Sequence, residues 1–186
     1  RLSGAPYRQA HSFGGEMAPT LIVVHDTAGR LDKGSSVNWF CSEDCNTSAH
    51  VVVERDGSVT QQVPFNRKAW HAGPSSWKGK SMCNSFAVGI EIVNPGKLDA
   101  NGRAWFHKKT EKGFPVAGLQ HVKTEAHGDG WWMDYTPEQI AVVSEALQAS
   151  GYSAAAVDLL IKQAILKAKD DEKTTIDLTA LVRNLK

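Results

Sequence analysis

The stretch FAVGIEIV at residues 86–93 decides how the chain folds, because it is a near-continuous apolar run interrupted by one acid. Such runs are typical of a strand that is buried on both faces of a sheet. Three further segments have strand character, and we expect them to form one sheet with it: 20–25, 48–54 and 58–63. Asp56-Gly57 suits a tight hairpin turn between the last two. The pattern predicts an α/β fold with a mixed β-sheet flanked by helices.

Two helices are expected to flank this sheet. Thr136-Pro137-Glu138 combines an N-cap residue, a proline in the first turn and an acid, and it predicts a helix over 136–149. A shorter helix is predicted over 35–40, with Ser35 or Ser36 as its N-cap.

The C-terminal residues differ in composition from the rest and contain no tryptophan. Apolar spacing predicts one helix over 153–169 and another that begins at Thr174 or Thr175 and ends near 185. We therefore expect a domain over 1–150 and a helical C-terminal appendage over 151–186. A broad apolar face on that appendage is a plausible homodimer surface.

Composition excludes several classes of protein. The chain has 186 residues, of which 41% are hydrophobic and 22% charged, as in an ordinary globular domain. A net charge of +1 gives no electrostatic case for binding nucleic acid, and no apolar run is long enough to span a membrane. Cys41 and Cys45 could form a local bridge or stay free, and with Cys83 they leave the redox compartment undecided.

Three features could carry chemistry. His25 lies at the C-terminal end of the strand at 20–25, where ligands often bind, although a lone histidine there is more often a hydrogen-bonded core residue. Glu91 lies inside an apolar strand and is either a solvated acid on an edge strand or a buried general base with a raised pKa. The segment AWHAGPSSW at 69–77 is either a pocket wall or a packed loop.

Five segments together resemble the type-2 N-acetylmuramoyl-L-alanine amidases, a family that includes peptidoglycan recognition proteins. They are LIVVHDTAG at 21–29, SAHVVVERDGSVTQQVP at 48–64, AWHAGPSSW at 69–77, FAVGIEIVN at 86–94 and YTPEQ at 135–139. The resemblance implies a mixed sheet with a groove over one face. It also implies zinc-dependent cleavage of the amide between N-acetylmuramic acid and L-alanine in peptidoglycan or muropeptides.

The resemblance also implies roles for single residues. His25 would be the first zinc ligand, Glu91 would activate the attacking water, and His71 would steady the oxyanion. Four further positions would line the substrate groove: Trp70, Trp77, Asn84 and His50. For Asn84 and His50 a structural hydrogen-bonding role is the alternative.

The C-terminal part departs from the family pattern. Members carry Gly-His and then a Lys-x-Asp-Pro-Gly or Lys-x-Cys-Pro motif after the helix that starts at YTPEQ, and these supply the other two zinc ligands. This chain has no histidine after His127 and no cysteine after Cys83. Catalytic zinc needs three protein ligands. Unless His121, His127 or a second chain supplies them, the predicted helical tail leaves the site open or metal-free.

Three functions follow from these observations. The first is a zinc-dependent peptidoglycan amidase, with the cell envelope, secretion or a phage as its setting. The alternative is a non-catalytic binder of peptidoglycan or muropeptides that has lost two zinc ligands. The third is an interaction protein whose C-terminal residues dock a partner, which the presence of His25, AWHAG and Glu91 argues against.

Overall fold

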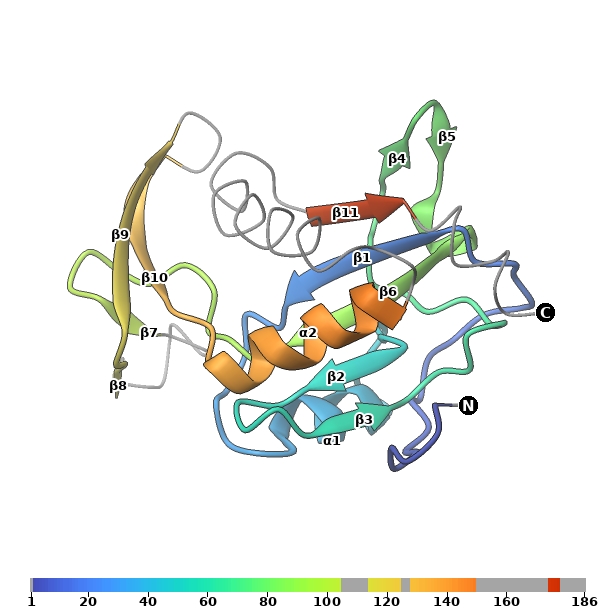
Figure 1. Cartoon of the computed structure of the whole chain (residues 1–186), viewed down its shortest axis with the longest axis horizontal. Coiled ribbons are helices and arrows are strands. Elements are labelled where there is room, and N and C mark those ends of the chain that lie inside the picture. Colours follow the sequence, from blue (N-terminus) through green and yellow to red (C-terminus); the bar gives the residue numbers. More distant parts are fainter. Residues whose placement is uncertain (1, 105–113, 125–127, 150–173, 178–186) are drawn as a thin grey trace.

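A five-stranded mixed sheet organises the protein in the computed structural model, which describes residues 2–104, 114–124, 128–149 and 174–177 (Figure 1). Its order is β11-β1-β6-β2-β3, in which β6 is parallel to β1 and β2, while β3 and β11 run antiparallel to their neighbours. The strands are β1 (Leu21–Asp26), β2 (Val51–Val53), β3 (Val59–Gln61), β6 (Ala87–Ile92) and β11 (Thr174–Asp177). The four predicted strands are confirmed, with the quoted apolar run at the centre.

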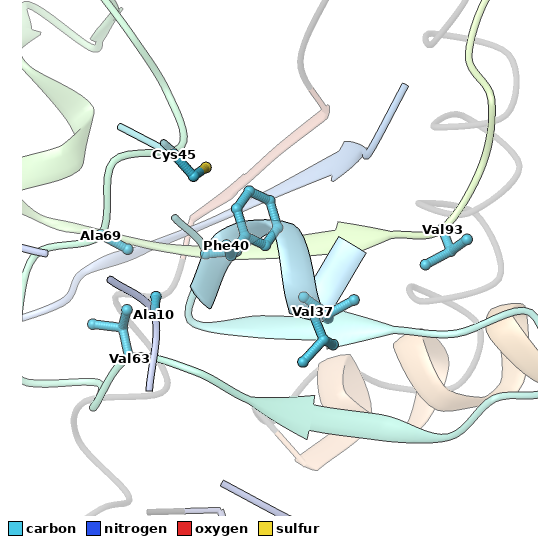
Figure 2. Packing of buried hydrophobic residues seen from close by; sticks show 9 residues of the cluster. Ala10, Val37, Phe40, Cys45, Val63, Ala69 and Val93 are labelled. Carbon is cyan, nitrogen blue, oxygen red and sulfur yellow. The ribbon is translucent and has the colours of Figure 1, made fainter. Parts of the chain in front are cut away.

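Helices cover both faces of this sheet. Helix α2 (Pro137–Ala149) lies across one face, where Val143 and Leu147 pack on a buried cluster of strand residues that includes Ile22 and Ile90 (Figure 1). Alternate strand residues point to the other face. There α1 (Ser35–Cys41) contributes Val37 and Phe40 to a second buried cluster (Figure 2). The predicted α/β class with helices flanking a mixed sheet is thus confirmed.

The two helices begin differently. The Thr136 hydroxyl accepts the N–H of Gln139 at 3.1 Å, and the Gln139 side chain accepts the N–H of Thr136 at 3.1 Å, so α2 begins with a capping box. The predicted serine cap of the short helix is wrong. Gly34, at φ 80°, precedes α1 instead, and a glycine has no side-chain oxygen for a capping bond.

Short antiparallel hairpins extend from the sheet. They consist of β4 (Ser76–Trp77) with β5 (Lys80–Ser81), β7 (Arg103–Ala104) with β8 (Phe114–Pro115), and β9 (Leu119–Thr124) with β10 (Gly128–Met133). The last two of these hairpins lie within 94–135, a polar segment rich in glycine and tryptophan that would be expected from its composition to form a loop. The strands of these hairpins pair with the next strand along the chain, and the N–H of Leu98 donates to the carbonyl of Trp131 in β10 at 2.8 Å.

The structure of residues 174–177 differs from the prediction for this part of the chain. Residues Thr174–Asp177 form β11 antiparallel to β1, where a helix was expected to begin. Three consecutive β-branched residues, Thr174, Thr175 and Ile176, favour a strand, and β1 would otherwise be the edge of the sheet. The helix expected over 153–169, with the appendage and the homodimer surface that it would form, lies outside the described residues.

Two further expectations concern the described part of the chain. Cys41, Cys45 and Cys83 are all free thiols, so the local bridge considered from their spacing is not formed. None of the described helices is long and apolar enough to cross a bilayer.

Candidate active site

His25 and Glu91 meet across the two parallel strands at the middle of the sheet. They are register partners in the pairing of β1 with β6, and register partners project to the same face. Their neighbours Val24, Ile90 and Ile92 pack toward α2, so His25 and Glu91 project to the opposite face. The shared face predicted for these two residues is confirmed.

The Glu91 side chain is nearly enclosed by protein. The residue is 8% exposed, and no hydrogen-bond partner of its Oε2 occurs among the described residues. Burial raises the pKa of this carboxyl well above its ordinary value, and the nearby charge of Asp26 raises it further. A carboxyl of this kind can exchange a proton closer to neutral pH than a solvated glutamate can.

Asp26 is a component of the site that the sequence analysis did not single out. Burial raises the pKa of its carboxyl, and a hydrogen bond from the N–H of Ala28 to Oδ1 at 2.9 Å partly opposes that effect. The charge of Asp26 acts on both Glu91 and Tyr135, and burial with that charge raises the pKa of the Tyr135 hydroxyl. The one feature of the sequence that could have identified Asp26 as part of the site is its position directly after His25.

The loop that carries His71 is held over β6. The Asn84 side-chain oxygen accepts the backbone N–H groups of His71 and Ala72, at 3.1 and 2.9 Å. The His71 ring lies over Gly89, where an added Cβ would come within 2.4 Å of the His71 Cγ. Asn84, which is 6% exposed, thus positions the loop, as the structural alternative for this residue proposed.

The His71 ring connects β6 to β1. Its Nε2 lies 3.2 Å from the Ala87 carbonyl, and its Nδ1 lies 3.0 Å from the Nε2 of His25. A carbonyl only accepts, so the single N–H of the neutral His71 ring is at Nε2. This N–H is already donated to the backbone, which argues against the expected use of His71 as a donor to a substrate oxyanion.

His50 is a structural residue in this arrangement. Its Nδ1 accepts the N–H of Gly89 at 2.9 Å, and its Nε2 donates to the carbonyl of Arg67 at 2.8 Å. Burial lowers the pKa of the imidazole to about 4, and the side chain is fully buried. The neutral ring joins β6 to the segment before the His71 loop, which agrees with the structural hydrogen-bonding role considered for this residue and leaves it no exposed surface toward a substrate groove.

The two tryptophans of the loop are both partly buried. The Trp70 ring packs over Gly14, where an added Cβ would lie 2.8 Å from its Cζ2. Trp77 packs on the buried cluster that contains Leu21 and Val23, and no partner for its buried indole N–H occurs among the residues described. Their partly exposed faces are compatible with the expected substrate contacts, which stay predictions.

Two histidine side chains come together at this place, but they do not form a set of three metal ligands. His25 Nε2 and His71 Nδ1 lie within 3.0 Å of each other, and imidazole nitrogens are good zinc donors. Over the described ranges, however, no three His, Cys, Asp or Glu side chains come together as metal ligands. His121 pairs instead with Asp129 at 2.6 Å on the β9–β10 hairpin, and His127 lies outside these ranges.

Comparison with known proteins identifies the family. The profile of the N-acetylmuramoyl-L-alanine amidase family (Amidase_2) matches residues 15–160. The 1,6-anhydro-N-acetylmuramyl-L-alanine amidase AmpD of Citrobacter freundii is 34% identical over 96 residues, covering 43% of this chain and 51% of the relative. The AmpD of Haemophilus influenzae is 56% identical over 64 residues, 34% of this chain and 35% of the relative. The matches thus span about half the length of these curated relatives or less.

A solved structure agrees at the level of the fold. A selenomethionine derivative of AmpD aligns with a TM-score of 0.51 at 22% identity, over 83% of this chain and 78% of that chain. The family profile covers well over half of the sequence and includes β1, the His71 loop and β6. The chain therefore belongs to the N-acetylmuramoyl-L-alanine amidase family.

Proposed function

We propose that this protein hydrolyses the amide bond between N-acetylmuramic acid and L-alanine in peptidoglycan or in muropeptides released from it. Family membership supports the reaction class, and the names of the AmpD relatives support the substrate class. The observation that carries the proposal is the position of Glu91, a buried acid that shares a sheet face with His25.

Glu91 is the residue proposed to move the proton. Its raised pKa lets the carboxylate accept a proton from an attacking water and then release it to the leaving amine of L-alanine. Val52, the register partner of Glu91 on β2, and Val23 are buried on the same face of the sheet and exclude bulk water from the base of the site. Attack at the carbonyl carbon forms the new C–O bond, and departure of the protonated amine breaks the C–N bond.

Zinc is the cofactor proposed for this site, with His25 as one ligand. When bound, it would supply Lewis acidity, which lowers the pKa of water and polarises the amide carbonyl. The described residues do not complete a set of three ligands, so the role proposed for Glu91 rests on the burial and position of its own side chain. The cell envelope, a secreted form or a phage remains the predicted setting.

Binding without cleavage is the second candidate function. It is favoured by one observation, the incomplete ligand set among the described residues. A protein of this kind would retain the Trp70 and His71 loop as a binding surface for muropeptides and would release no product.

One experiment separates these two functions. The full chain, purified without chelators, is incubated with an N-acetylmuramoyl peptide, and the products are identified by mass spectrometry. The amidase proposal predicts a peptide that begins with a free L-alanine amine, together with unsubstituted N-acetylmuramic acid. Calorimetric binding of the same compound without these products would favour the binder, and absence of both binding and cleavage would refute both functions.

A further inference from the structure

We propose that the segment before β1 positions the Trp70 indole for ligand binding, and that Gly14 is the positioning residue. The inference rests on the proposed function, because it takes the partly exposed Trp70 ring as a contact for the N-acetylmuramoyl peptide. The family profile begins to match at residue 15, so Gly14 lies outside the part of the chain that the family shares.

This segment pairs with the residues just before the Trp70 loop. The N–H of Gly14 donates to the carbonyl of Lys68 at 2.8 Å, and the N–H of Lys68 donates to the carbonyl of Gly15 at 3.0 Å. The Arg67 Nε donates to the carbonyl of Gly14 at 2.9 Å, and its guanidinium lies over the Phe13 ring, 5.3 Å from the ring centre. The main chain of Gly14 is therefore fixed relative to the start of the loop.

The backbone of Trp70 is held by other contacts. The Ser48 hydroxyl accepts the N–H of Trp70 at 2.9 Å, and the N–H of Ser48 donates to the carbonyl of Trp70 at 3.1 Å. The next residue, His71, is held by the Asn84 side chain, and its ring lies 3.0 Å from that of His25. Trp70 is thus attached to the border of the candidate site, and its indole is the part that can change place.

The place of the indole depends on the missing side chain of Gly14. An added Cβ would lie 2.8 Å from Cζ2 and 3.0 Å from Cη2 of Trp70, at the far end of the ring system. It would also lie 3.1 Å from the Cβ of Lys68, a contact that a small shift relieves. The φ of Gly14 is not among the positive values, so alanine fits the backbone there. A side chain at this position would therefore move the ring without straining the main chain.

A fixed indole is suited to binding a sugar. Tryptophan offers a large apolar face, and the C–H groups on one side of a pyranose ring form a flat apolar surface that fits it. A ring that already lies in its bound position loses little conformational entropy when the ligand arrives, and such preorganisation increases affinity. The affinity for the N-acetylmuramoyl group should therefore depend on where Gly14 lets the indole lie.

Calorimetric affinities and steady-state kinetics of the full chain with an N-acetylmuramoyl peptide test this proposal. Gly14→Ala adds the methyl group that meets the ring. Gly15→Ala is the matched control, because an added Cβ at the next residue meets none of the described residues within 4 Å. Trp70→Phe removes Cζ2 and Cη2, and combining it with Gly14→Ala completes a double-mutant cycle. Circular dichroism and thermal unfolding check the fold of each variant.

Gly14→Ala should weaken binding by about 2–10-fold, the range for one well-placed aromatic contact. It should raise KM by the same factor at unchanged kcat, because the contact binds substrate and transition state alike. Gly15→Ala should keep wild-type values. In the Trp70→Phe chain, Gly14→Ala should have no further effect, because the atoms that the methyl group meets are absent. Wild-type affinity of a folded Gly14→Ala chain would overturn the proposal, as would an equal effect with and without the indole.

Fluorine spectra of the full chain labelled with fluorotryptophan provide a second measurement, in case Gly14→Ala does not fold. The Trp70 resonance is the one missing from the Trp70→Phe spectrum, and it should shift in the otherwise unaltered protein when the peptide binds. A Trp70 resonance that does not respond to the peptide would contradict the proposal. Normal cleavage and affinity in Gly14→Ala reject only this inference, whereas binding that depends on Gly14 but gives no cleavage rejects only the amidase function.

Discussion

At the scale of single residues, Gly89 matters because the absence of its side chain leaves room on β6 for the His71 ring. A Cβ there would lie 2.4 Å from the Cγ of His71, which is closer than real contacts allow. We expect Gly89→Ala to displace the His71 ring and to lower the free energy of unfolding by about 1–3 kcal/mol, the usual cost of overpacking. Chemical denaturation measures the loss.

Gly15→Ala is the matched control for this change. An added Cβ at Gly15 has no atom within 4 Å, and its φ is not among the positive values. Its unfolding free energy should stay within about 0.5 kcal/mol of wild type. Equal stability of the Gly89→Ala and Gly15→Ala chains would show that the ring has other space available.

His50 predicts a pH dependence of stability. Its pKa is about 4 in the folded protein and about 6.5 when unfolded, so between these values the unfolded chain binds a proton that the folded chain does not. The free energy of unfolding should therefore decrease as the pH falls from about 6.5 to about 4, by about 3 kcal/mol in total. Denaturation curves across this range measure the slope.

His50→Gln provides the comparison, because a glutamine amide can accept from Gly89 and donate to Arg67 without titrating. The slope between about pH 6.5 and about pH 4 should become much shallower in this variant. An unchanged slope would assign the pH dependence to other groups, such as Glu91.

At the scale of elements, the start of α2 is fixed by Thr136. Its hydroxyl accepts the N–H of Gln139 and donates to the carbonyl of Arg55 at 2.7 Å. Thr136→Ala should lower the free energy of unfolding by about 1 kcal/mol, the typical cost of losing an N-cap. Ser144→Ala, which removes only a bond to the Ile140 carbonyl inside the helix, should change it much less. Thermal unfolding that ranks these two variants in the opposite order would contradict the capping role.

Strand β11 predicts a role for the end of the chain in the sheet. It pairs with β1 from Leu21↔Asp177 to Val24↔Thr174. Truncation after residue 173 should therefore increase hydrogen exchange of the β1 amides that face β11, because these amides lose their acceptors. Amides of β2 should keep their protection. Unchanged exchange along β1 would show that this pairing adds no protection in solution.

Local pattern predicted most elements of the sheet but not those formed by long-range pairing. The apolar run at 86–93, the Asp56-Gly57 turn and the Thr136 cap are signals within a few residues, and the strands and helix that they predict are present. The strand at 174–177 forms against β1, which is far earlier in the chain, so the helical spacing of its apolar residues was misleading.

The candidate site was predictable to a similar extent. Strand alternation and motif placed His25 and Glu91 correctly on one face. The contact between His25 and His71 was not predictable, because it depends on the path of a loop over Gly89 and on the amide of Asn84. His50 is fully buried in the structure. Its position after Ser48-Ala49 in the sequence does not predict that burial.

At the scale of the whole molecule, the two faces of the sheet have different tasks. The face toward α2 is filled by aliphatic side chains such as Ile90 and Leu147, while Glu91 and His25 project to the other face. The proposed chemistry thus lies on the face opposite α2, next to the buried residues that α1 contributes there. A substitution that removes the chemistry of Glu91 should accordingly leave the fold intact.

The rate of amide cleavage by Glu91→Gln, compared with wild type, tests the proposed role of Glu91 most directly. Glutamine keeps the shape of the side chain but cannot accept the proton, so turnover of an N-acetylmuramoyl peptide should fall by about 10²–10⁴-fold, while calorimetric binding of the peptide and the unfolding temperature stay near wild type. The control Glu145→Gln, at an exposed position of α2, should retain full turnover. Wild-type turnover by a folded Glu91→Gln chain would contradict the central claim that Glu91 moves the proton.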